Sequence, residues 1–385
     1  MAYPIDRRQF LGRGVRALGG AAMLGIGGPA LLEACSSSSK SGSSSSSAAA
    51  TGTTAAAAGG PTTVAPGSLG TLNWMESWVP DVESGGEYIA VSKGYWTQQG
   101  FSSVNIIPGG PNATPQETMV ETGKALIAIS SFDSTAAAIE KGFSIIVIGA
   151  QYQKNPFAIM SAATKPLKTP QDMIGKKIGV QSDNDAVWAA FLKANNLTMS
   201  QVDTVPVSFD PTPLTQGTVD GWFSFIDNEP IELADKGFQT VTFLLADFNY
   251  PEVGNIYVCT KDSLANDRDK VKAAMIGDIL GWKDALTNPT EAATLAVQKG
   301  QGLAMSDELK QADIQNTQLM AIGDALTNGL FYVTPASQAS SCKTLALGGT
   351  NVTPAQCFDM SLLDEIYTDA SLKAVPTPVS TPVSS

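Results

Sequence analysis

The stretch Thr169-Pro170-Gln171-Asp172-Met173-Ile174-Gly175-Lys176-Lys177-Ile178-Gly179-Val180 places the start of a helix directly before a short strand. Thr169 is suited to cap that helix, and Pro170 fits its first position. Asp172 stands three residues after the cap, where an acidic side chain completes a capping box. A capped helical turn followed at once by an apolar strand is typical of layered α/β proteins.

The same alternation extends in both directions, from about Thr71 to Val375. A second capped start, Thr114-Pro115-Gln116-Glu117, repeats the pattern, and short apolar runs separate the helical stretches. No G-x-G-x-x-G follows a strand and no G-x-x-x-x-G-K-[ST] occurs, so neither a dinucleotide fold nor a P-loop is indicated. The predicted strands are Thr71–Met75, Val104–Ile107, Leu126–Ser130, Ile145–Gly149, Lys177–Val180, Thr204–Val207 and Gly221–Phe225.

Composition excludes several classes of function. The net charge of −12 disfavours nucleic-acid binding, which depends on neutralising phosphates. The sequence contains no histidine, so catalytic triads and zinc sites that need one are excluded. The four cysteines include no C-x-x-C pair. We therefore expect no catalytic residues, no metal and no cofactor.

The first 34 residues resemble a twin-arginine export signal that ends in a lipoprotein cleavage site. Arg7-Arg8 precedes a weakly apolar stretch, Ala17–Leu32, which is short for a membrane span. Leu32-Glu33-Ala34-Cys35 resembles a lipobox, with Cys35 as the lipidated residue and Glu33 as an unusual member. The alternative is an unmodified signal followed by a chance cysteine.

The segments on either side of the α/β region are low in complexity. Residues 35–70 are rich in Ser, Ala, Gly and Thr and predict a disordered linker. Residues 376–385 repeat Pro and Thr and predict a disordered tail. With Cys35 lipidated, we expect an exported protein tethered to the outer face of the cytoplasmic membrane, extracellular or periplasmic.

Several motifs, in order, resemble the substrate-binding proteins of ABC importers for thiamine pyrimidines, riboflavin and alkanesulfonates. The resemblance covers roughly Leu72 to Leu264. The motifs that carry it are Asn73-Trp74, Gly85–Val91, Lys93–Trp96, Gln99–Phe101, Gly109–Pro111, Ile139–Gly142, Pro170–Val180, Gly217–Gly221 and Asn228–Pro230.

This resemblance implies a type II periplasmic-binding fold, in which two lobes close on a small molecule and deliver it to a permease and an ATPase. Lobe 1 would comprise residues 71–152 with 262–375, and lobe 2 residues 153–261. The chain would cross between the lobes near Gln151–Asn155 and Cys259–Lys261.

Ligands of open α/β sheets bind beyond the carboxyl ends of the strands. Trp74 and Trp78 are candidates to stack on a flat ring, although either tryptophan can instead serve packing. Asp133 and Glu229 can each be a helix-start carboxylate rather than a ligand contact. The full set of candidates is Trp74, Glu76, Trp78, Glu83, Asp133, Gln151, Asn184, Asn228 and Glu229.

Four classes of function stay open at this point, one of them a cell-surface adhesion or sensor lipoprotein. The aromatic and acidic candidates favour a flat heteroaromatic compound, such as an aminopyrimidine or a flavin. Nitrate, sulfonate or taurine binding is the alternative, and an enzyme like the pyrimidine synthases that share the fold is a weaker one, because those enzymes depend on a histidine. Cys342 and Cys357 suit a disulfide in an exported protein, and Cys259 suits a buried thiol.

Overall fold

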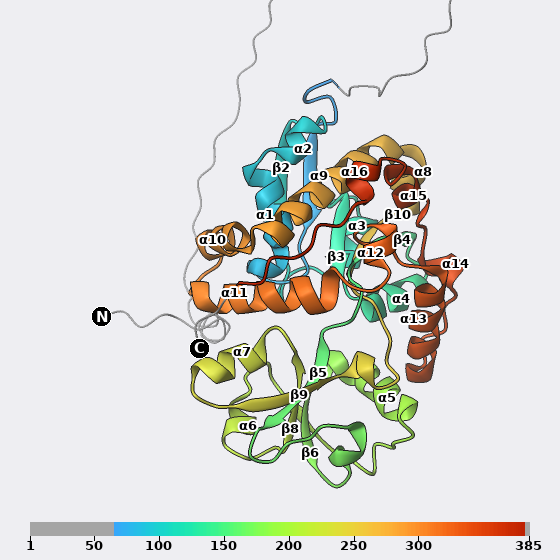
Figure 1. Ribbon diagram of the computed structural model, residues 1–385. Coiled ribbons are helices and arrows are strands. Elements are labelled where there is room, and N and C mark those ends of the chain that lie inside the picture. The colour runs from blue at the N-terminus through green and yellow to red at the C-terminus, as the bar shows by residue number, and fades with distance from the viewer. Residues whose placement is uncertain (1–64, 382–385) are drawn as a thin grey trace, which may run out of the picture.

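The computed structural model describes residues 65–381 and contains two five-stranded mixed sheets, each with helices packed around it (Figure 1). The first sheet has the order β2-β1-β3-β10-β4 and the second the order β7-β6-β8-β5-β9. Within each sheet three strands are parallel, and β10 or β5 runs antiparallel to its neighbours. This is an α/β, two-lobed architecture, as the sequence predicts.

All seven predicted strands are present, and three more complete the sheets. The three additional strands are β5, β9 and β10, and β5 and β9 pair with each other in the second sheet. The strands are β1 (Thr71–Met75), β2 (Ser103–Ile107), β3 (Ile127–Ser130), β4 (Ile145–Tyr152), β5 (Phe157–Ala162), β6 (Lys177–Gln181), β7 (Asp203–Val207), β8 (Gly221–Phe225), β9 (Thr240–Leu244) and β10 (Gly254–Thr260).

The helices of the first 250 residues follow strands, as in other α/β folds, whereas those after β10 form a continuous helical region. The α-helices are α1 (Gly85–Ser92), α2 (Tyr95–Gln98), α3 (Gln116–Glu121), α4 (Phe132–Glu140), α5 (Asp185–Ala194), α6 (Thr212–Thr215), α7 (Glu229–Asp235), α8 (Lys261–Asn266), α9 (Arg268–Thr287), α10 (Pro289–Lys299), α11 (Met305–Ile314), α12 (Ala325–Asn328), α13 (Pro335–Gly348), α14 (Pro354–Cys357), α15 (Ser361–Ile366) and α16 (Ala370–Lys373). Shorter turns are 3₁₀ helices η1 (Val82–Ser84), η2 (Pro170–Met173), η3 (Ser182–Asn184) and η4 (Leu245–Asp247), and a π-helical turn η5 (Gln315–Met320) continues α11.

The chain crosses between the sheets twice, and the second crossing differs from the prediction. β10 pairs with β3 and β4, so the crossing precedes Gly254 and the expected position at Cys259–Lys261 is wrong. Residues 254–261 therefore belong with the first lobe. The two crossings lie side by side, because Asn155 donates its backbone N–H to the carbonyl of Glu252 at 3.0 Å.

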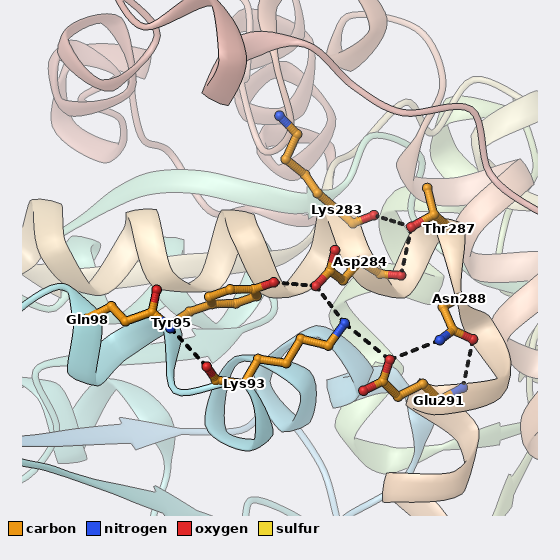
Figure 2. A network of polar contacts seen from close by, with 8 residues as sticks. All are labelled: Lys93, Tyr95, Gln98, Lys283, Asp284, Thr287, Asn288 and Glu291. Carbon is orange, nitrogen blue, oxygen red and sulfur yellow. Dashed lines mark hydrogen bonds and ion pairs between the residues drawn. The ribbon is translucent and has the colours of Figure 1, made fainter.

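The C-terminal helices complete the first lobe. α9 packs across α1 so closely that a Cβ on Gly281 would lie 2.1 Å from the carbonyl oxygen of Gly86. On the surface beside this crossing, Lys93 bonds Asp284 at 2.8 Å and Glu291 at 3.2 Å, and Tyr95 donates to Asp284 at 2.5 Å (Figure 2). This network ties the turn between α1 and α2 to the joint between α9 and α10.

α13 departs from the expected lobe division because it contacts both lobes. Cys342 and Leu345 belong to the first hydrophobic core, whereas a Cβ on Gly348 would lie 3.2 Å from the Cβ of Ala190 on α5 in the second lobe. The helix is thus a third link between the lobes, beside the two crossings (Figure 1).

Both ends of the folded body extend beyond the predicted limits. Leu69, in the expected linker, donates its N–H to the carbonyl of Gly100 at 3.0 Å. In the expected disordered tail, Val379 donates to the carbonyl of Leu286 at 2.8 Å and Thr381 to that of Leu309 at 3.2 Å. Residues 376–381 therefore run across α9 to α11 (Figure 1), and the prediction of disorder there is wrong.

The predicted export signal, Cys35 and most of the linker lie outside the described residues. Within residues 65–381, no helix combines the length and apolar character needed to cross a bilayer.

Candidate functional site

A cavity of about 430 Å³ lies between the two sheets, a size typical of small-molecule sites. The ends of strands from both lobes open into it. Ser77 and Trp78 follow β1, Ser130 ends β3, Gln181 ends β6, and Phe225 ends β8. This is the position that the sheet topology favours for a ligand.

Aromatic rings line the cavity from both lobes. Phe157, Phe223 and Phe225 of the second sheet form a cluster with centroid separations of 5.2 Å. Trp78 from the first lobe and Phe209 from the second approach each other with their ring centroids 5.7 Å apart. Flat apolar faces from two sides suit a planar ligand.

Six of the nine predicted binding residues line this cavity. They are Trp78, Glu83, Asp133, Asn184, Asn228 and Glu229. Their roles as ligand contacts remain predictions, but the structure brings them together from β1, β3, β6 and β8 as the sequence reasoning expected.

Trp74 does not reach the cavity, and its expected place at the cleft mouth is wrong. Its side chain is fully buried in the first core, with Trp96 at 5.3 Å and Tyr257 at 5.8 Å between ring centroids. The strand alternates faces, so Trp74 points into the lobe, whereas Trp78 lies beyond the strand end and is partly exposed.

Glu76 and Gln151 are also buried away from the cavity. Burial raises the pKa of the Glu76 carboxyl to about 7. Gln151 donates its side-chain N–H to the carbonyl of Glu83 at 2.9 Å. Gln151 therefore positions the turn that carries Glu83 rather than lining the site itself.

Glu83 is held at the centre of the cavity wall by two donors. Ser77 donates its hydroxyl and Asn255 its amide to Oε1 of Glu83, each at 2.7 Å. Asn255 is the second residue of β10, just after the second crossing, so this contact links a cavity residue to the connection between the lobes.

The carboxylates at helix starts have mixed roles. Glu229 accepts the N–H of Phe225 at 2.9 Å, which supports the helix-start interpretation of this residue. Asp133 lies in the first turn of α4, where Ser131 is the cap. One carboxylate oxygen of Asp133 is buried without a hydrogen-bond partner among the described residues, and burial raises its pKa.

Several lining residues were not among the sequence candidates. Phe209, Asn255 and the α11 residues come from segments distant in sequence, and no local motif identifies them. Asp227 directly precedes the candidates Asn228 and Glu229 but is not one of the predicted residues. The additional polar and aromatic lining residues include Gln116, Phe157, Gln181, Phe209, Phe223, Phe225, Asp227, Asn255, Asp307, Glu308 and Gln311.

The three cysteines of the described chain are free thiols and are buried. The predicted disulfide is thus absent from the structure, but Cys342 and Cys357 form a hydrogen-bonded thiol pair. This contact lowers the pKa of Cys342 and raises that of Cys357. Cys259 is a buried thiol, as predicted. No cluster of metal-ligating side chains occurs within residues 65–381.

A model of the family described as NMT1/THI5 like matches residues 81–292, more than half of the chain. The chain belongs to this family. The matched region includes both crossings and most of the strands that open into the cavity.

Two curated relatives are similar in sequence. The riboflavin-binding protein RibY of Chloroflexus aurantiacus is 25% identical over 58% of this chain and 64% of its own length, so the chain spans less than two thirds of that relative. The formylaminopyrimidine-binding protein of Halalkalibacterium halodurans is 22% identical over 58% of this chain and 69% of its own length.

Among solved structures, the periplasmic aliphatic sulphonate binding protein SsuA of Escherichia coli aligns with a TM-score of 0.59. The alignment covers 82% of this chain and 94% of that one at 15% identity. The fold is therefore that of the periplasmic binding proteins, as predicted.

Proposed function

We propose that this protein is the exported, lipid-anchored solute-binding component of an ABC importer, and that it captures a flat heteroaromatic compound by closing its two lobes. The observation that carries the proposal is the cavity between the lobes, where aromatic residues of both sheets meet polar strand ends. The curated relatives bind riboflavin and a formylaminopyrimidine according to their names, which supports a ring compound as ligand.

Lobe closure is supported by contacts that only a closed cleft can make. Trp78 meets Phe209 across the cleft, and Lys310 of α11 forms an ion pair with Asp235 of α7. The two crossings are short and adjacent, which is the arrangement of a hinge.

The alternative is an anion such as nitrate or a sulfonate, as in the sulphonate-binding structural neighbour. Anion binding needs donors or cations, and among the described residues that line the cavity there is no lysine or arginine. Catalysis by a histidine-dependent route is excluded by the composition of the chain. We therefore favour binding of a ring compound.

The test is a thermal-shift and calorimetric screen of the purified protein. Riboflavin and 4-amino-5-hydroxymethyl-2-methylpyrimidine represent ring compounds, and taurine, methanesulfonate and nitrate represent the alternative. Stabilisation by a ring compound with saturable binding supports the proposal. Saturable binding of the anions alone contradicts it.

The anchor is tested separately in cells of the source organism. Cys35→Ser should move the protein from the membrane fraction to the soluble extracytoplasmic fraction, because one thioether-linked lipid group is lost. A Cys259→Ser variant is the matched control and should stay in the membrane fraction. Retention of Cys35→Ser in the membrane would contradict lipid anchoring.

A further inference from the structure

The lining of the cavity is strongly acidic. Eight of its residues carry a carboxyl group, and none of the described lining residues is basic. They are Glu83, Asp133, Asp183, Asp227, Glu229, Glu232, Asp307 and Glu308. Acidic residues alone define no site, so the state of each group decides what the cavity can bind.

Helix starts face the cavity, and such starts commonly attract anions. Here each start already holds a carboxylate from its own first turn. α4 carries Asp133, α5 carries Asp185, and α11 carries Asp307 and Glu308. These carboxylates offset the partial positive charge of the helix ends. An anionic ligand entering this cavity would meet carboxylates instead of free N–H groups.

Three of these eight carboxylates accept hydrogen bonds from neighbouring groups of the protein. Glu83 accepts from Ser77 and Asn255, Glu229 accepts from Phe225, and Glu308 accepts the N–H of Val82 at 2.7 Å. These carboxylates therefore use part of their hydrogen-bonding capacity within the protein.

Asp227 differs from these residues. It is only 3% exposed and lines the cavity, and among the described residues its carboxylate has only its own backbone N–H as a hydrogen-bond donor. Its turn joins β8 to α7 and is bonded to the first crossing, where Ile226 donates to the carbonyl of Pro156 at 3.0 Å. A buried carboxylate without an opposite charge beside it is costly, and a positively charged group is the partner that removes this cost.

Aromatic faces complement this carboxylate. Trp78, Phe209, Phe157, Phe223 and Phe225 line the same cavity, and aromatic faces attract cations as well as flat rings. A neutral ring gains only the stacking contacts, whereas a charged ring gains both.

We propose that the ligand is a flat heteroaromatic cation whose positive charge lies against Asp227. This inference rests on the proposed function and adds that the ring compound carries a positive charge. Glu83 and Glu229 flank the charge, and the aromatic residues hold the ring.

Proton linkage follows from the surroundings of Asp227. Burial raises the pKa of Asp227 well above its usual range, and the nearby Glu83, Asp81 and Glu229 raise it further. Tyr152 is the other titratable group that interacts with it, and its own pKa is raised. A cation against Asp227 favours the ionised carboxylate, so cation binding should be accompanied by proton release. Affinity for a cation should rise with pH, while affinity for a neutral ring should change little.

The experiment compares rings of similar size and different charge by calorimetry on the wild-type protein. Thiamine and 1-methylnicotinamide are the cations, nicotinamide and pyrazinamide are neutral, and nicotinate is the anion. We expect the cations to bind at least about ten times more tightly than neutral rings, and nicotinate to bind most weakly. The cation preference should grow as pH rises.

Asp227→Asn should abolish most of this preference, with neutral rings binding as before. Asp203→Asn, which removes an equal charge from an exposed position on β7, should keep it. If Asp227→Asn does not fold, as judged by circular dichroism, the pH dependence of the wild-type preference decides the matter.

Neutral rings that bind as tightly as cations overturn this inference but leave the proposed function intact. Binding of the anion alone, or no binding by any ring compound, overturns both.

Discussion

Trp78 and Phe209 come from different lobes, and their ring centroids lie 5.7 Å apart at the cavity. Trp78 follows β1 and Phe209 follows β7, so the contact exists only when the lobes are closed. The pair is placed to cover a ligand and to report on closure.

Removing either ring should weaken ligand binding. Phe209→Ala should reduce affinity for a bound ring compound by about ten- to a hundred-fold, because one aromatic stack is worth about 1–3 kcal/mol. Calorimetry measures the loss, and the intrinsic fluorescence of Trp78 should respond less to ligand. Phe238→Ala is a control in the same lobe outside the cavity. Unchanged affinity in Phe209→Ala would exclude this residue from the site.

The difference between Trp74 and Trp78 shows where sequence reasoning succeeds and where it stops. Both stand at the end of a correctly predicted strand, and the motif order indicates the fold and the cleft edge. The inward direction of Trp74 depends on its packing against Trp96 of α2 and Tyr257 of β10, which local sequence does not specify.

Prediction from sequence is also limited where residues far apart in the chain build the cavity together. α11 contributes Asp307 and Glu308 to a cavity built mainly by residues some eighty or more positions earlier, and no spacing rule connects them. In the turn after β8, the sequence locates a polar group at the cleft but cannot tell Asp227 from Asn228. β5 and β9 complete the second sheet by pairing with β8 and with each other, and no local motif specifies this pairing.

Glu76 predicts a pH dependence of stability. Its pKa rises from 4.5 to about 7 on burial, so between these values the folded state keeps a proton that the unfolded state releases. The free energy of unfolding should therefore fall as pH rises through this window, by up to about 3 kcal/mol.

Glu76→Gln removes this titration. Urea unfolding at pH 4.5, 6 and 7.5 should show the variant gaining stability over the wild type as pH rises. Asp269→Asn, at an exposed position on α9, should follow the wild type. Parallel curves for Glu76→Gln and the wild type would show that Glu76 titrates normally.

Cys342 and Cys357 should form a disulfide once the protein is oxidised. Their thiols are already in contact. A disulfide that closes a loop of this length stabilises the folded protein by roughly 3 kcal/mol, because it lowers the entropy of the unfolded chain. Non-reducing peptide mapping should find the joined peptide, and Cys357→Ser should lower the Tm of the oxidised protein only. Cys259→Ser is not expected to abolish the cross-link. Three free thiols after mild oxidation would contradict the prediction.

Closure should also depend on Lys310, which joins α11 of the first lobe to Asp235 of α7 in the second. The Lys310 and Asp235 side chains are 27% and 36% exposed, so solvent and salt screen the pair, and its contribution is about 1 kcal/mol or less. Lys310→Met should thus weaken ligand binding by no more than about five-fold, mainly through faster dissociation from a cleft that opens more often.

Lys272→Met is the matched control, because Lys272 pairs with Glu365 at 2.6 Å on helices α9 and α15, which belong to the first lobe. Stopped-flow dissociation at low and at high salt separates the two variants: the wild type should approach the Lys310→Met rate as salt increases, while Lys272→Met should dissociate like the wild type throughout. Equal dissociation rates for all three proteins at low salt would show that the ion pair between α7 and α11 does not hold the lobes together.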